Sequence, residues 1–163
     1  MGCRKLIEID PPIDSVTTVE VFTNDGLAIS AMAGVYSGMC HGFGRNPREN
    51  TGFSTGLSTL IGGLSSDELN LFARAGGGDL YLYNTNRISA ANSAASTTIW
   101  TSGYKVIYGA NAVIEGIAAS TSGALNDNIR TRLTAEAKFV RAFSYFYLTN
   151  FFGDVPMALT LDF

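Results

Sequence analysis

The sequence predicts a mostly α-helical protein whose last two helices pack as antiparallel neighbours. Apolar residues recur every three or four positions over residues 100–117 and again over 133–151, which is typical of helices with one buried face. Only a short polar stretch separates these segments, so the chain is expected to reverse direction between them. Of the 163 residues, 46% are hydrophobic and 15% are charged, a composition typical of a globular domain.

The beginning of the chain is expected to be an extended tether, followed by one helical domain over residues 23–163. Pro11 and Pro12 oppose helix formation, so residues 1–22 are predicted to be extended. The first helix of the domain is predicted to begin near Thr23 or Asn24, either of which can cap it. Its apolar residues at helical spacing are Ala28, Ala31, Met32, Val35 and Met39.

The middle of the chain is predicted to be rich in loops. Residues 40–52 and residues 79–97 are polar or glycine-containing and are expected to lie at the surface. Between them a weaker helix is predicted over residues 53–64, where three glycines lower the helix propensity.

The last two helices carry recognisable end signals. Ser96 or Thr97 is expected to cap the third helix, and Asn126 is expected to cap the fourth. Gly153 stands where a residue with positive φ usually ends a helix, and Pro156 prevents the helix from resuming.

The fourth helix is rich in aromatic residues and is therefore expected to be buried on most sides. Two charged residues within it are expected to have structural partners. Glu136 can pair with Arg132 one turn earlier, and Arg141 is expected to pair with a carboxylate or an aromatic ring.

Several functional classes are excluded or disfavoured by the composition. The formal net charge of −3 and the pI of about 5 give no general attraction for nucleic acid. No run of about 20 apolar residues is present, so no transmembrane helix is expected. His41 is the only histidine, which leaves no metal cluster and no plausible catalytic triad. No placed pair of catalytic carboxylates is recognisable, so neither an enzyme nor a cofactor is expected.

Two blocks of sequence form a combined motif. The first is a Trp-x3-Tyr-x2-Ile-x3-Asn helix beginning at Trp100. The second consists of Ala135-Glu136-Ala137-Lys138-Phe139-Val140-Arg141-Ala142, Tyr145-Phe146-Tyr147-Leu148 and Phe152-Gly153-Asp154-Val155-Pro156. In order and spacing these blocks resemble the most diagnostic segment of the SusD/RagB family. The stretch from Cys3 to Pro11 is similar to the start of mature family members, in which a lipidated cysteine precedes a short tether.

The resemblance implies a fold of tetratricopeptide-like helix pairs, although no tetratricopeptide consensus is visible in the chain. It also implies a lipid-anchored protein at the outer-membrane surface of Bacteroidota. Such a protein works with a SusC-like TonB-dependent transporter and captures glycans or other nutrients. Family members continue well past the Gly-Asp-Val-Pro segment, so this chain is expected to be an N-terminal portion.

Site residues follow from the same resemblance. Cys3 is the expected lipidation site; the rival, N-myristoylation of Gly2, requires Ser or Thr where the chain has Leu6. The residues of the structural signature are Trp100, Tyr104, Asn111, Glu136, Arg141, Gly153, Asp154 and Pro156.

A glycan would need aromatic rings for stacking and amide or guanidinium groups for hydrogen bonds. These groups occur together at Tyr81, Tyr83, Asn84 and Arg87. Alternatively, this stretch is a solvated loop whose tyrosines are incidental, and buried rings would count against a binding role. The alternative function is a structural module that docks on a transporter, or a fragment without ligand binding of its own.

Overall fold

The computed structural model describes residues 18–42, 52–72, 79–89 and 94–162, and this part of the chain is mostly helical. The predicted fold class is therefore confirmed, and no strand occurs among the described residues. The elements are α1 (Thr18–Val21), α2 (Asp25–His41), η2 (Phe53–Leu57, a π-helical turn), α3 (Ser58–Ser65), α4 (Asp79–Asn84), α5 (Ala94–Ala119) and α6 (Asp127–Phe152).

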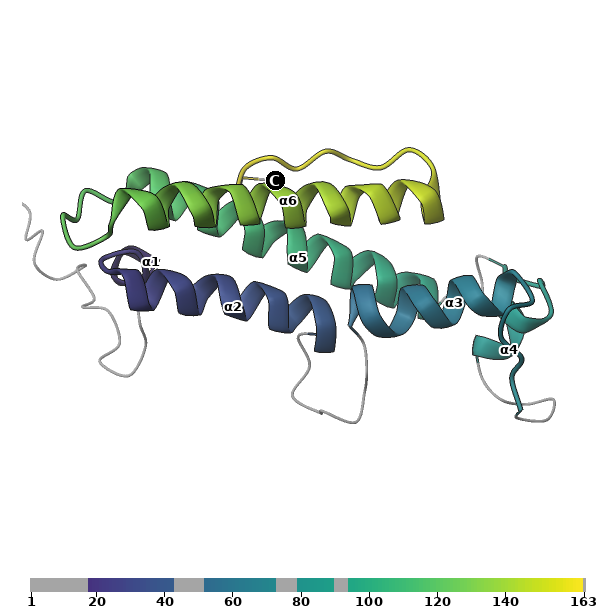
Figure 1. Ribbon diagram of the computed structural model, residues 1–163. Helices are drawn as coiled ribbons and strands as arrows, with labels where there is room; N and C mark the ends of the chain where they lie inside the picture. Colours follow the sequence, from purple (N-terminus) through teal and green to yellow (C-terminus); the bar gives the residue numbers. More distant parts are fainter. Residues whose placement is uncertain (1–17, 43–51, 73–78, 90–93, 163) are drawn as a thin grey trace, which may run out of the picture.

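The helices α5 and α6 form an antiparallel pair that contacts along its length, as the sequence predicted. Helix α2 packs against both members of this pair, and η2 and α3 continue along the same side toward the far end of the molecule (Figure 1). After α6 the chain turns and runs back along that helix. This returning segment, residues 153–162, is called the strap below.

Two clusters of buried side chains form the core. The first lies between α2, α5 and α6 and includes Met32, Val35, Val113, Leu133 and Val140. The second lies at the other end and includes Phe53, Ile61, Tyr83, Ile99 and Leu148. Phe143 of α6 is half-buried and packs against both clusters, so the two parts of the core meet at this ring.

The helix ends agree with most of the predicted signals. Asn24 caps α2, since its side chain accepts a hydrogen bond from the Leu27 amide at 3.0 Å. Asn126 caps α6 by accepting from the Asn128 amide at 2.9 Å. Gly153 ends α6 with a φ of 76°, a conformation that favours glycine.

The prediction that residues 1–22 are extended is wrong for residues 18–21. Residues 18–21 form the short helix α1, and Thr23 closes the turn by donating from Oγ1 to the Glu20 carbonyl at 2.7 Å. Pro12 lies six positions before this helix and does not constrain it. The adjacent Phe22 is buried, and it packs where Gly116 has no side chain.

The prediction of a long loop over residues 79–97 is wrong at both ends. Residues 79–84 form α4, and α5 begins at Ala94, so Ser96 and Thr97 lie inside its first turn rather than capping it. Similarly, α2 extends through His41, which was expected in a loop. The helix predicted over residues 53–64 is present as η2 followed by α3.

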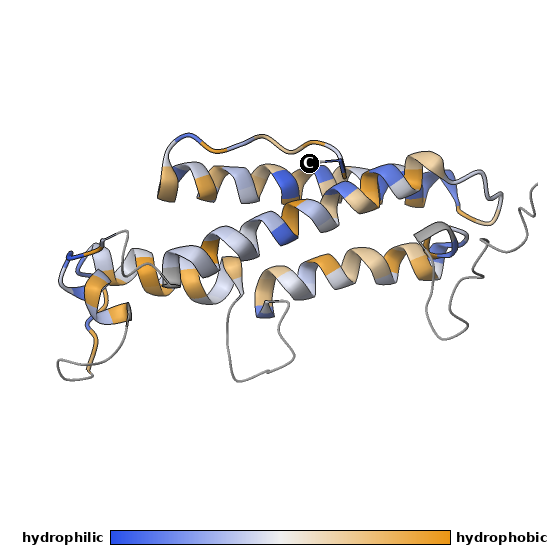
Figure 2. Ribbon diagram, turned by 180° about the vertical axis from the view of Figure 1, so that it is seen from behind, coloured by the Kyte–Doolittle hydropathy of each residue, from blue (hydrophilic) through white to orange (hydrophobic). Residues whose placement is uncertain are grey.

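Helix α6 is not buried on most sides, because two of its aromatic rings face solvent. Phe139 is 65% exposed and Phe146 is 62% exposed. Figure 2 shows orange patches along α6 next to blue ones, whereas α2 carries little blue between its ends. None of the described helices has the length and apolar character that crossing a membrane requires.

Candidate functional site

Helix α4 places the four predicted ligand residues in different surroundings. Tyr83 is 3% exposed, and a buried ring counts against a binding role at this position, while Tyr81 is half-buried. Asn84 is half-buried and accepts a hydrogen bond from the Leu71 amide at 2.8 Å. Arg87 is exposed just beyond the helix. Tyr81, Asn84 and Arg87 remain candidate ligand residues.

Tyr83 is buried because α4 folds against the start of α5. Its hydroxyl shares a hydrogen bond with the hydroxyl of Ser96, which joins the two helices. Residues 80–83 lie in the segment predicted to be a loop, but they belong to helix α4, which turns Tyr83 into the second core cluster. The polar hydroxyl then needs a partner, and Ser96 supplies it.

A pocket of about 310 Å³ lies beside α4, between α3, the start of α5 and the end of α6. Three aromatic rings line it, those of Tyr83, Phe151 and Phe152, together with Ile61, Ile88 and Ile99. Its polar lining residues are Ser65, Ser96 and Asn150, and Gly62 completes the wall. Such a mixture of apolar walls and few polar groups is typical of small-molecule sites. Sequence reasoning missed this pocket, because its walls come from residues that are up to 91 positions apart.

The signature residues on α5 and α6 hold the strap. Asn111 is fully buried and donates from Nδ2 to the carbonyls of Ala158 at 3.1 Å and Thr160 at 3.0 Å. Its Oδ1 accepts a hydrogen bond from Arg141 at 2.8 Å, and the same guanidinium nitrogen donates to the Leu159 carbonyl at 3.1 Å. Arg141 thus binds Asn111 and the strap, so its partners are an amide and a carbonyl rather than the expected carboxylate or ring.

Two tyrosines and a glutamate complete this set of bonds. Tyr104 donates to the Pro156 carbonyl at 2.6 Å, and Tyr145 bonds both the carbonyl and the amide of Ala158, at 2.9 Å and 2.6 Å. Glu115 accepts from the Leu161 amide at 2.9 Å. Burial raises the pKa of Tyr104 above its ordinary value, and the neighbouring Tyr145 adds to the rise. Burial also raises the pKa of Tyr145, against the opposing effects of its bond to Ala158 and of Arg141.

The remaining signature residues support the ends of this arrangement. Trp100 packs against Tyr104, with ring centroids 4.9 Å apart, and meets Phe152 edge to face at 5.2 Å. Glu136 pairs with Arg132 at 3.4 Å, as predicted, and accepts from the Tyr36 hydroxyl at 3.4 Å. Burial, followed by the Glu136 charge, raises the pKa of Tyr36. Asp154 is exposed at the turn into the strap.

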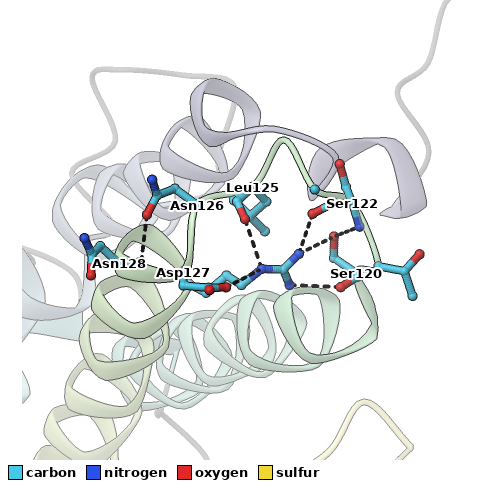
Figure 3. Close-up of a pocket in the computed structure, with 9 residues that line it drawn as sticks. Ser120, Ser122, Leu125, Asn126, Asp127 and Asn128 are labelled. Carbon is cyan, nitrogen blue, oxygen red and sulfur yellow. Dashed lines mark hydrogen bonds and ion pairs between the residues drawn. The ribbon is translucent and has the colours of Figure 1, made fainter.

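Arg130 was not singled out by sequence reasoning, although it organises the turn between α5 and α6. Its guanidinium donates to four carbonyls at 2.8–3.1 Å, those of Ile117, Ser120, Ser122 and Leu125. Figure 3 shows Ser120, Ser122 and Leu125 around this turn. The last carbonyls of α5 have no partners within their own helix, so a cation in the first turn of the next helix is the signal that could have identified Arg130.

The broad pocket at this turn is a weak candidate for a ligand site. It is lined mainly by small polar residues and by Arg130, whose donors already serve the carbonyls of the turn. The Asp127 carboxylate is fully exposed and lies 3.8 Å from Arg130, a separation that gives little attraction in water. We therefore assign this pocket to the architecture of the turn.

No metal-binding cluster occurs among the residues that the structure describes, and His41 is exposed at the end of α2. Cys40 is half-buried and is not in a disulfide. The predicted lipidation site, Cys3, lies outside the described residues.

Comparison with known proteins gives a consistent result. A family described as starch-binding and associating with the outer membrane, SusD-like, matches residues 70–162. A SusD-like protein of Bacteroides ovatus is 36% identical over 56 residues, and one of Formosa agariphila is 32% identical over 69 residues. These matches cover 34% and 42% of this chain, but only 10% and 12% of the two relatives. No solved structure matches the chain.

Proposed function

This chain belongs to the SusD-like family of starch-binding proteins that associate with the outer membrane, and from that membership we propose that it captures glycans at the cell surface. The observation that carries the proposal is the aromatic pocket beside α4, with the half-buried Tyr81 and the exposed Arg87 on the same short segment. Aromatic faces and neutral polar groups are the chemistry that recognises sugars, and both are present at this end of the molecule.

The proposal is tested by measuring glycan binding. A glycan array should give positive signals for this chain, and isothermal titration with the best glycan should then follow Tyr81→Ala and Arg87→Ala. Loss of one stacking ring is expected to weaken binding several-fold, corresponding to about 1 kcal/mol, with an unchanged melting temperature. Tyr81→Phe, which keeps a ring, is the matched control. Absence of any glycan signal would contradict the proposal.

We further propose that Cys3 carries the lipid anchor and that a SusC-like TonB-dependent transporter is the partner for uptake. A diacylglycerol together with an amide-linked acyl chain exceeds the single-chain minimum for stable anchoring. Mass spectrometry of the protein isolated from native membranes should place the acyl mass on Cys3. An unmodified Cys3 in exported protein would contradict the anchor, and failure to co-purify a transporter would contradict the partner.

A second candidate function is a structural module that docks on the transporter without binding a glycan. The surface of α2 favours it, because this helix has no charged residue between Asp25 and His41 (Figure 2). Leu27, Ile29 and Tyr36 are exposed on it. A pull-down with the transporter alongside the glycan array separates the two functions, since docking alone predicts capture of the transporter and an empty array.

We do not propose an enzymatic role. The carboxylate of Glu136 in α6 is engaged with Arg132 and Tyr36, which is a structural arrangement rather than that of a free catalytic acid. Incubation with polysaccharides should release no reducing sugar, and measurable release would overturn this assignment.

A further inference from the structure

We propose that the pocket between α3, α4 and the end of α6 binds one uncharged sugar ring and discriminates against anionic sugars. The inference deepens the proposed function and rests on it. It assigns a specific cavity and a single-ring mode of binding, neither of which the description of the family gives.

The aromatic walls are fixed in place by contacts outside the pocket. Phe152 meets Trp100 edge to face at 5.2 Å, and Phe151 lies 6.4 Å from Phe152 with the rings inclined at 59°. Tyr83, which is 3% exposed and hydrogen-bonded to Ser96, supports the wall from the core, so the half-buried Phe151 and Phe152 are the rings available for stacking. Rings that are already positioned lose little freedom on binding, so they are suited to stacking against the apolar face of a pyranose.

The polar groups of the pocket are neutral hydrogen-bonding groups. Asn150 donates from Nδ2 to the Phe146 carbonyl at 2.6 Å, which orients the amide, and its Oδ1 is an acceptor for a sugar hydroxyl. Ser65 contributes a hydroxyl from α3. A few such groups in an apolar site determine the orientation of a ligand rather than most of its affinity.

The charge of the walls predicts the selectivity. None of the described lining residues carries a formal charge, and Arg87 is exposed and is not among them. Moving a carboxylate or a sulfate into such surroundings without a paired cation is costly. A neutral hexose meets no such penalty.

The size of the pocket limits how much of a glycan it can hold. Its volume of about 310 Å³ lies near the lower end of the range for small-molecule sites, so one ring fits better than an oligomer. Ile88, which is 48% exposed, lies at the boundary between the pocket and solvent. The rest of a glycan chain would leave past this residue.

The experiment uses a glycine that lines the pocket. A Cβ atom added at Gly62 would meet no atom within 4 Å, so the side chain of Gly62→Leu has room to extend into the pocket that this residue lines. Gly34 on α2 is equally open and lies outside the pocket, so Gly34→Leu is the matched control. Circular dichroism and thermal unfolding check that both variants keep the fold.

Trp100 provides the readout, because it is the only tryptophan in the chain and touches Phe152 in the pocket wall. Methyl α-glucopyranoside should change its fluorescence saturably in the wild type and in Gly34→Leu, but not in Gly62→Leu. Saturation-transfer NMR on the same samples provides a second readout of ring binding. The methyl glucuronide should bind at least tenfold more weakly.

Equal binding by Gly62→Leu and wild type, equal affinity for the glucuronide, or no response in either readout would overturn the inference. Maltoheptaose distinguishes this failure from failure of the proposed function. If maltoheptaose binds wild type and Gly62→Leu equally but not Arg87→Ala, glycan capture stands and the pocket is not the site.

Discussion

At the residue scale, Asn111 is a buried side chain that joins the strap to α5 and α6. It is fully buried and uses both ends of its amide, donating to two strap carbonyls and accepting from Arg141. A leucine of similar volume would remove all three hydrogen bonds, although the Ala158 carbonyl would keep Tyr145 as a donor and Arg141 would keep its bond to the Leu159 carbonyl. Because unsatisfied buried polar groups cost more than an average hydrogen bond contributes, Asn111 is more than a packing residue.

We predict that Asn111→Leu lowers the free energy of unfolding by about 2–3 kcal/mol, as measured by urea denaturation. Thr160→Ala is the control within the strap, because its side chain is exposed, and it should change stability by less than about 0.5 kcal/mol. Similar effects of the two substitutions would mean that the amide does not hold the strap.

The two strap tyrosines predict a pH dependence. Burial is the main cause that raises the pKa of Tyr104 and of Tyr145 above the ordinary value of 10.0, so folding favours their protonated forms. Their contribution to stability is fully present below about pH 10 and is lost as the pH rises through the folded-state pKa values. Urea unfolding between about pH 8 and pH 11 should show this decline. Replacing both tyrosines by phenylalanine should flatten it, and an unchanged slope would contradict the assignment.

At the element scale, the α5–α6 pair could be predicted from sequence, whereas α4 could not. The pair is specified by two long segments with apolar residues at helical spacing and by the capping residue Asn126 between them. These signals are local in the sequence, so they can be identified without knowledge of tertiary contacts. Helix α4 has only six residues, and its burial depends on Ser96 of another helix. The pocket also depends on tertiary contacts and could not be predicted, since no local pattern links Ile61 to Phe152.

The turn between α5 and α6 gives a prediction for this pair. Arg130→Met should destabilise the protein by about 2–3 kcal/mol, because four carbonyls at the end of α5 and in the turn each lose a charged donor. Arg132→Met is the neighbouring control. Its ion pair with Glu136 is largely exposed, so its loss should cost less than about 0.5 kcal/mol. Equal costs in chemical denaturation would argue against the role of Arg130.

At the scale of the whole molecule, the two core clusters are joined through Phe143. This ring packs against both clusters, while Phe139, one turn earlier on α6, is 65% exposed. The Phe143 ring is part of the surface through which α6 packs against the rest of the fold. Packing at this position therefore affects both ends of the molecule.

Phe143→Ala is expected to lower the stability by about 2–4 kcal/mol through lost burial and the cavity that it leaves. Phe139→Ala should change stability by less than about 1 kcal/mol, because its ring already faces water. Unfolding should be followed both by Trp100 fluorescence, which reports on one end, and by circular dichroism, which reports on all helices. If Phe143→Ala shifts only one of the two signals, the clusters are not coupled through this ring.

The strap has a consequence for sequence tolerance. The side chains of Tyr104, Asn111, Arg141 and Tyr145 bind its carbonyls and one of its amides, and none of these bonds involves a strap side chain. Met157 and Leu159 instead point largely into solvent, at 74% and 50% exposure. The helices thus hold this part of the strap mainly through its backbone. Positions 157 and 159 are therefore free to vary, whereas the residues that bind the backbone are not, and neither is Ala158, which is buried in the second core cluster.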